Sequence, residues 1–186
     1  MVELKSHKAY EMLSAQYKEC LLDYIILQLE EPYQGVISHK RAVTYAFDRL
    51  FERERVGNYN RNTRKFCCLP EKMSAVADTP DSLLSLPDDV YYQTRPAGGH
   101  AFDIPVPIPY WYAFLEPPYG VPYVTKDFEK LNHVLFPFPD ALEVYRFNDG
   151  FSDYFDEGKE WWGTGCWSAY DGVTGIFVII CASLSD

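Results

Sequence analysis

The sequence lacks the short motifs that commonly identify an enzyme. It has no Gly-x-Ser-x-Gly nucleophile turn and no phosphate-binding P-loop, and its four histidines show no HxH, HxxxH or HExxH spacing. The longest apolar run, Ile176–Ala182, is too short to cross a membrane. These absences predict no cofactor, no metal and no membrane insertion, although a metal held by residues far apart in sequence remains an alternative.

Cysteines are few, and none of them has the spacing of a disulfide framework. The five cysteines include no CxxC pair, and Cys67 and Cys68 are adjacent, which strains a bond between them. The first residues, MVELKSHKAYEM, contain no apolar stretch of the kind found in signal peptides. We therefore expect reduced thiols and a cytoplasmic protein.

Basic residues are scarce in the second part of the chain. The net charge is −10, and residues 73–186 contain 5 Lys and Arg against 17 Asp and Glu, whereas residues 1–72 contain 12 against 10. Phosphate backbones and anionic lipids attract basic surfaces, so this charge disfavours nucleic acid and membrane surfaces as partners. It favours a basic protein or a cationic ligand. The simpler alternative is that the charge only keeps the protein in solution.

Apolar spacing predicts helices early in the chain. Residues 6–30 and 38–54 each repeat apolar side chains at helical intervals, which predicts an N-terminal helical hairpin. Residues 58–103 are rich in polar and turn-forming types and read as loop, with a short strand or helix inside 70–100. We expect a single domain, 1–186, with a helical part (1–57), a loop-rich part (58–103) and a strand-rich part (104–186).

The strand-rich part follows from proline and turn signals. Prolines bracket one predicted strand, Tyr110–Leu115, and a further helix is predicted near 125–136 with Thr125 as its N-cap. Three strands are predicted at 142–147, 163–170 and 175–183, the last two joined by a turn at Asp171-Gly172. The predicted fold class is α+β: a helical hairpin followed by an antiparallel sheet with one further helix.

One segment, 147–171, combines many carboxylates with many aromatic rings, and only Lys159 is basic between Asp149 and Asp171. Clustered carboxylates repel one another, which favours a cationic group nearby, and aromatic faces bind cations or stack on sugars. The candidate binding residues are Asp153, Asp156, Glu157, Glu160, Trp161, Trp162 and Tyr170. They suggest a basic protein or a cationic or polyhydroxyl ligand as the partner. Two alternatives stay open: a glycan hydrolase that uses two of the carboxylates, and a solvated turn over a core.

Two other motifs are weaker. Glu116-Pro-Pro-Tyr119 is similar to the Asp-Pro-Pro-Tyr motif of amino-methyltransferases, but Glu replaces Asp and the glycine-rich cofactor turn is missing. Cys166 has no base beside it in the sequence to lower its pKa, so a buried strand position is expected for it.

The second part of the chain also resembles a known family. The segments HAFDIPVPIPYWYAFLEPPYG, NHVLFP, YFDEGKEWWGTGCWSAYD and FVIICASLSD resemble bacterial hypothetical proteins of unknown function over about residues 100–186. That resemblance implies no activity. In size, acidity and lack of catalytic motifs the chain is also similar to immunity proteins, which inhibit toxins by covering their active sites. The lack of catalytic motifs, together with the acidic and aromatic cluster, favours a non-catalytic interaction protein.

Overall fold

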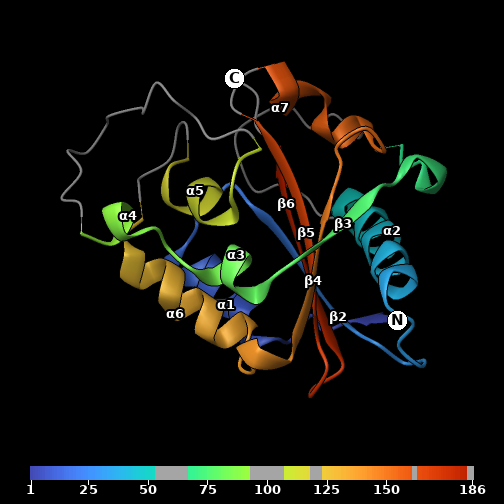
Figure 1. Cartoon of the computed structure of the whole chain (residues 1–186), viewed down its shortest axis with the longest axis horizontal. Helices are drawn as coiled ribbons and strands as arrows, with labels where there is room; N and C mark the ends of the chain where they lie inside the picture. Colours follow the sequence, from blue (N-terminus) through green and yellow to red (C-terminus); the bar gives the residue numbers. More distant parts are fainter. Residues whose placement is uncertain (53–66, 93–106, 118–122, 161–162, 184–186) are drawn as a thin grey trace.

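A computed structural model describes residues 1–52, 67–92, 107–117, 123–160 and 163–183. Within these ranges the chain is an α+β structure with one six-stranded antiparallel sheet (Figure 1). The strands are β1 (Val2–Glu3), β2 (Asp23–Gln28), β3 (Ala75–Asp78), β4 (Leu142–Phe147), β5 (Thr164–Asp171) and β6 (Ile176–Ser183). The helices are α1 (Lys8–Gln16), α2 (Val36–Glu52), α3 (Pro80–Leu84), α4 (Asp88–Tyr92), α5 (Tyr110–Leu115), α6 (Thr125–Leu135) and α7 (Asp156–Glu160), with 3₁₀ turns η1 (Pro70–Lys72), η2 (Pro139–Ala141) and η3 (Asp153–Phe155).

The sheet has the strand order β1-β2-β6-β5-β4-β3, and each neighbouring pair is antiparallel. β4, β5 and β6 form the predicted meander, within one residue of the predicted bounds. The Asp171 carboxylate accepts hydrogen bonds from the N–H groups of Val173 (2.8 Å) and Thr174 (3.2 Å). Gly175 follows with a φ of +71°, which few other residues adopt. The predicted position of the turn and the role of Asp171 are therefore confirmed, but the glycine with a positive φ is Gly175 rather than Gly172.

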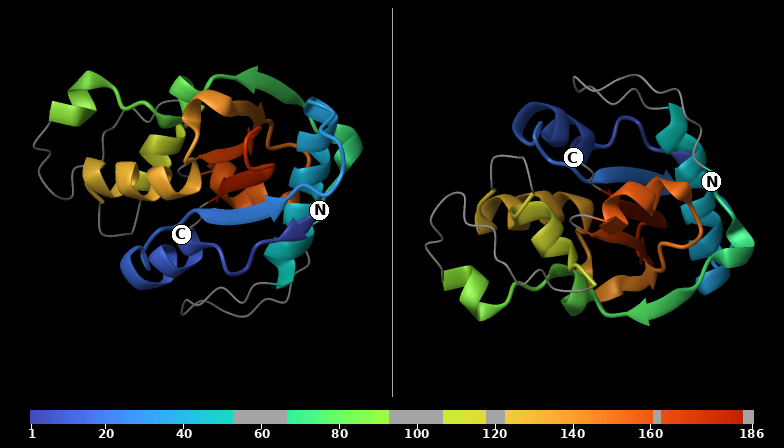
Figure 2. Two further views of the ribbon diagram at one scale, coloured as in Figure 1. Left: turned by 90° about the horizontal axis from the view of Figure 1, so that it is seen from below. Right: turned by 90° about the horizontal axis from the view of Figure 1, so that it is seen from above.

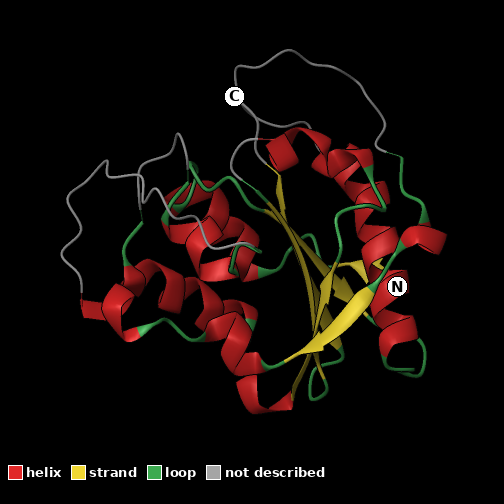
Figure 3. Cartoon of the chain, turned by 45° about the horizontal axis from the view of Figure 1, so that its top comes forward, coloured by secondary structure: helices red, strands yellow, loops and turns green. Residues whose placement is uncertain are grey.

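Helices cover both faces of the sheet. In Figure 1 the sheet is seen nearly edge-on, with α2 on one side and α1, α3, α5 and α6 on the other. The two views of Figure 2 and the coloured ribbon of Figure 3 show the same layers. Side chains alternate between two cores: in β6, Phe177, Ile179 and Cys181 face α2, whereas Val178 and Ile180 face the other helices. Burial on both faces explains why β6 is an unbroken apolar run.

The predicted N-terminal helical hairpin is wrong. The first element is the short strand β1, which precedes α1. Helix α1 ends at Gln16, and the second half of the helix predicted at 6–30 contains strand β2. The apolar side chains at Tyr17, Cys20, Leu21 and Tyr24 had suggested one helical face. However, four consecutive residues of β2, 24–27, are buried, because the strand is central and packed on both faces. Continuous burial and β-branched isoleucines favour the strand.

The predicted strand at Tyr110–Leu115 is also wrong, because this segment is helix α5. Five of its six side chains are buried, and it packs against α3 and α6 rather than beside another strand. Away from a sheet edge, a buried segment satisfies its own peptide groups only by forming a helix. Proline before the first turn is compatible with such a helix, since Pro109 sits at the N-cap.

The remaining predictions hold in part. The helix predicted near 125–136 is α6, although Val124 rather than Thr125 is its N-cap, and the Asp127 carboxylate accepts a hydrogen bond from the Val124 N–H (3.2 Å). The helix predicted at 38–54 is α2, which begins two residues earlier at Val36. The predicted loop 70–100 contains β3, α3 and α4 in its described part. The expected polar turn at 58–65 lies outside the described residues.

All five cysteines are free thiols. Cys166 and Cys181 are buried in β5 and β6, Cys20 and Cys68 are half-buried, and Cys67 is exposed. The buried strand position expected for Cys166 is confirmed.

Candidate functional site

Helix α7 carries three of the predicted site residues on the surface. Asp156, Glu157 and Glu160 are exposed, and the Lys159 ammonium lies 3.2 Å from the Asp156 carboxylate. This ion pair between residues three apart is solvent-exposed and contributes little to stability. The helix follows η3 directly, so its position is set by the buried rings beneath it. The acids of α7 therefore lie on a helix that is packed on the core through η3, and their side chains are exposed.

The aromatic residues of the same segment serve the core. Phe151, Tyr154 and Phe155 are buried, and all three rings pack around Phe47 of α2 at centroid distances of 5.1 to 5.7 Å. The Tyr154 hydroxyl donates to the Asp23 carboxylate at the start of β2 (2.7 Å). Of the predicted aromatic site residues next to α7, Trp161 and Trp162 lie outside the described residues. The rings of Phe151, Tyr154 and Phe155 therefore anchor η3 to α2 and to β2 and do not line a surface.

Asp153 has a structural contact. One oxygen of its carboxylate accepts a hydrogen bond from the Cys67 N–H (2.7 Å). The bond ties η3 to the strand-like segment at Cys68, which bridges to Ser152. The hydrolase alternative needs one of the four carboxyl groups in a water-poor cleft. Three of the four are exposed on α7 and the fourth caps a backbone amide, so the described geometry supplies no such group.

Tyr170 lies at the opposite end of β5 from α7. It lies six positions after Thr164, the first residue of the strand, which corresponds to about 20 Å of extended chain. The structure therefore does not bring Tyr170 together with the acids of α7. Its ring stacks on Tyr33 instead, with centroids 4.1 Å apart and the planes inclined by 8°. Across the sheet its pairing partner is Glu143 of β4.

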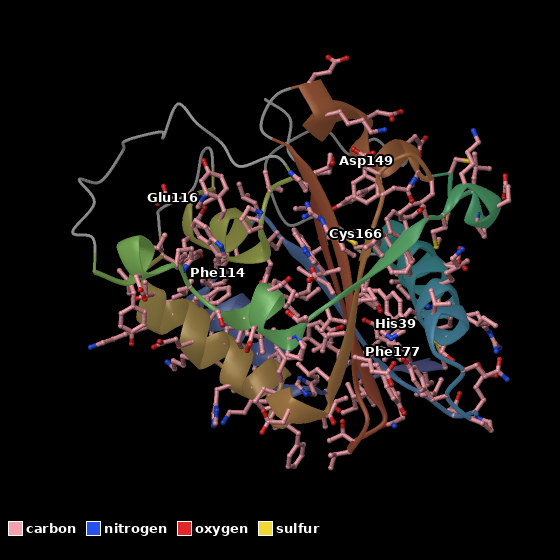
Figure 4. The ribbon with its side chains drawn as sticks, in the orientation of Figure 1. His39, Phe114, Glu116, Asp149, Cys166 and Phe177 are labelled. Carbon is pink, nitrogen blue, oxygen red and sulfur yellow. The ribbon has the colours of Figure 1, made fainter. Side chains whose placement is uncertain are left out.

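This second location contains a carboxylate, two tyrosines and a buried histidine, joined by hydrogen bonds. The Tyr33 hydroxyl donates to the exposed Glu143 carboxylate (2.7 Å) and lies 2.9 Å from His39 Nε2. His39 Nδ1 lies 2.8 Å from the Ser168 hydroxyl of β5. His39 and Ser168 are both fully buried. Figure 4 shows His39 on α2 beside Phe177 of the sheet, well away from Asp149 at the α7 end.

The hydrogen-bond pattern determines the protonation of this histidine. Burial lowers the pKa of His39 from 6.5 to about 3, so the ring is neutral at pH 7 and carries one N–H. Because the single Tyr33 proton goes to Glu143, the phenol oxygen must accept from Nε2–H. Nδ1 is then the acceptor for the Ser168 hydroxyl. All the bonds point the same way, from Ser168 to Glu143, and such chains strengthen each bond within them.

The arrangement is unsuited to nucleophilic catalysis but suited to holding a surface. Ser168 meets a histidine as catalytic serines do, yet it is fully buried, so a substrate has no access to it. At the outer end, Tyr33 and Tyr170 are half-buried and Glu143 is exposed. Burial and the neighbouring Glu143 carboxylate raise the pKa of Tyr33, so its proton stays on the phenol. The series of hydrogen bonds from Ser168 to Glu143 thus fixes the Glu143 carboxylate beside the stacked rings of Tyr33 and Tyr170. We call Glu143, Tyr33 and Tyr170 the tyrosine–glutamate surface.

Sequence reasoning found Tyr170 but missed Tyr33, His39, Glu143 and Ser168 as a group. One signal was present: His39 lies on the apolar stripe of α2, since it precedes Val43, Ala46 and Leu50 at helical spacing. A polar residue on such a stripe is buried and needs hydrogen-bond partners. Those partners come from 33, 143 and 168, and no local pattern in the sequence connects these positions.

No family model matches this chain, and neither a curated protein nor a solved structure is significantly similar to it. In the described ranges, no three His, Cys, Asp or Glu side chains are grouped so as to hold a metal ion. None of the described helices is long and apolar enough to cross a membrane. Any functional assignment therefore depends on the chemistry of the two acidic locations.

Proposed function

We propose that the chain is a non-catalytic binding protein that presents an acidic, aromatic surface to a basic partner protein. The observation that carries this proposal is the tyrosine–glutamate surface. It joins an exposed carboxylate to two stacked phenol rings: Tyr33 is hydrogen-bonded both to Glu143 and to the buried His39, and Tyr170 stacks on Tyr33. Binding sites of this composition are common because tyrosine combines an apolar ring with little conformational entropy to lose.

The chemistry of this surface suits an arginine side chain. A guanidinium group bonds to a carboxylate and lies flat on an aromatic ring at the same time. Within the described part of the chain, no ion pair occupies Glu143. The Tyr33 hydroxyl donates to one oxygen of the Glu143 carboxylate, which leaves the other oxygen to accept from a partner. The net charge of −10 attracts a basic protein over longer range.

A matched pair of variants separates a specific site from general attraction. Glu143→Gln and Glu160→Gln each remove one negative charge, at the tyrosine–glutamate surface and on α7 respectively. Binding of a fluorescent hexa-arginine peptide, followed by anisotropy at about 150 mM salt, should weaken about tenfold in Glu143→Gln. The affinity for the peptide should change less than about twofold in Glu160→Gln, because solvent and salt screen the exposed Glu160 carboxylate.

Two results decide against this placement of the site. Equal weakening in both variants means that only net charge attracts the peptide. Weakening in Glu160→Gln alone, or in the combined Asp156→Asn, Glu157→Gln and Glu160→Gln variant, places the site on α7 as the sequence had suggested. Retention of binding when lysine replaces arginine in the peptide argues against the planar, stacked geometry.

A further inference from the structure

Three cysteine thiols from distant parts of the sequence meet at the α7 end of the sheet. Cys166 of β5 and Cys181 of β6 are directly paired across the two strands, and their sulfur atoms lie 3.9 Å apart. Both are buried, at 1% and 0% exposure. Cys68 is half-buried and packs against the same core, held there by its bridge to Ser152 of the segment before η3. Figure 4 shows Cys166 on the sheet, toward α2.

Cys68 connects the buried pair with the surface. Burial raises the pKa of Cys68 to about 11, and the charges of Asp48 and Cys166 add to the effect. Cys68 packs against the same core cluster that contains Cys166 and Cys181. Cys67, the neighbour of Cys68, is exposed, so a reagent from solvent can approach this segment. A buried pair with a half-buried third thiol packed against the same core has the parts needed for stepwise exchange. Because exchange requires the thiolate, the raised pKa of Cys68 makes the first attack slow at neutral pH and faster as the pH rises.

We propose that Cys166 and Cys181 are a redox-active dithiol, which low-molecular-weight disulfides oxidise through Cys68 to a reversible intramolecular disulfide. The inference does not depend on the proposed binding function. It fits the geometry, because directly opposite residues in antiparallel strands have Cβ atoms about 4.5–5.5 Å apart, and a disulfide needs about 3.5–4.5 Å. A small approach of β5 to β6 closes the bond.

The exchange balances without any other reagent. The Cys68 thiolate attacks one sulfur of an external disulfide RSSR, giving a mixed disulfide and releasing the first RS⁻. The Cys166 thiolate then attacks the Cys68 sulfur, and the second RS⁻ leaves. Finally the Cys181 thiolate attacks the Cys166 sulfur, which forms Cys166–Cys181 and returns Cys68 as a thiolate. In sum, two protein thiols lose two electrons and two protons, and RSSR becomes two RSH.

Glutathione disulfide tests the proposal on the folded chain. The protein is incubated under native conditions, quenched with acid, alkylated in denaturant and digested. We expect a peptide linked through Cys166 and Cys181 as the main product, which dithiothreitol reverses. A bond between Cys67 and Cys68 as the main product, stable glutathionylation, or no disulfide after prolonged incubation overturns the proposal. This mapping uses the unaltered protein, so it does not depend on the folding of any variant.

Matched serine variants test the route. Cys68→Ser should slow formation of the Cys166–Cys181 bond by about tenfold or more, whereas Cys67→Ser at the exposed neighbour should change the rate by less than about twofold. Circular dichroism spectra that match the unaltered protein show that both variants are folded. Equal rates in Cys68→Ser and the unaltered protein mean that Cys68 is not the entry point and contradict the route.

Discussion

The two ends of β5 hold carboxylates in opposite circumstances. At the Thr164 end, α7 displays three acids that face solvent, and the rings beneath them belong to the core. At the Asp171 end, the exposed Glu143 carboxylate receives a hydrogen bond from Tyr33, which is in turn hydrogen-bonded to buried His39. The α7 acids are more numerous, and their side chains are exposed. A carboxylate obtains a fixed position from the donors attached to it, and the number of acids nearby in the sequence does not reveal this.

Removal of the buried His39 side chain should change the free energy of unfolding more than any other substitution considered at the two ends of β5. His39→Ala should lower the free energy of unfolding by about 3 kcal/mol, because it opens a cavity under α2 and leaves the buried Ser168 hydroxyl without its acceptor. Urea denaturation measures the effect. At the other end of β5, Glu160→Ala should stay within about 0.5 kcal/mol of the unaltered protein. A His39→Ala loss as small as that of Glu160→Ala would show that the network adds nothing to stability.

Acid should weaken the protein through the same histidine. The pKa of His39 is about 3 in the folded chain and 6.5 in ordinary surroundings, so below pH 6.5 the unfolded state binds the proton that the folded state refuses. Stability is therefore fully present above pH 6.5 and is lost as the pH falls toward 3. Between pH 6.5 and 4.5 the loss should be about 2 kcal/mol. Denaturation of His39→Gln in the same pH series should lack this component; identical pH profiles would refute the assignment.

Removal of one hydroxyl oxygen from each of the two stacked rings, Tyr33 and Tyr170, separates the contribution of hydrogen bonding from that of ring packing. Tyr33→Phe removes the donor to Glu143 and the acceptor for His39, and should cost about 1–2 kcal/mol of unfolding free energy. Tyr170→Phe keeps the stack and breaks no described hydrogen bond, so its effect should stay below about 0.5 kcal/mol. Thermal melts of the two variants test this. Comparable losses would mean that ring packing matters more than the hydrogen bonds.

The smallest change in the free energy of unfolding is expected for substitutions on α7. Asp156→Asn with Glu160→Gln breaks the exposed pair with Lys159 but relieves repulsion among the acids. These two effects nearly cancel in water, so the free energy of unfolding should change by less than about 0.5 kcal/mol. A larger loss, measured by urea denaturation at low salt, would show that α7 carries structural charge pairing that its exposure does not suggest.

Much of the fold was readable where local signals agreed. The β4–β5–β6 meander was predicted because apolar runs alternate with strong turn signals, and Asp171 and Gly175 indeed build the last turn. Strand β2 and helix α5 were misread because both are buried on all sides. A short apolar segment of this kind carries no periodicity that separates strand from helix. Its state is chosen by its neighbours, which are β6 for the strand and α6 for the helix.

The site was less accessible to sequence reasoning for a related reason. Tyr170 was identified as a candidate, but its partners depend on strand register and on the docking of α2. The pairing of Glu143 with Tyr170 follows only once β4 and β5 are aligned. The stacking of Tyr33 on that pair brings together residues 137 positions apart. The acids of α7 attracted notice in the sequence because they are contiguous, and contiguity is what a solvated surface helix also provides.

The pairing of β2 with β6 has a consequence for how the protein is made. The central part of the sheet pairs residues 23–28 of β2 with residues 176–181 of β6, so β2 has no hydrogen-bonding partner on its inner side until β6 has been synthesised. During synthesis β2, with its run of buried isoleucine and leucine, must wait while more than a hundred residues emerge. Contacts this distant in sequence slow folding and leave apolar strands open to aggregation in the meantime. The inner edge of β2 therefore stays unpaired until almost the whole described chain has been made.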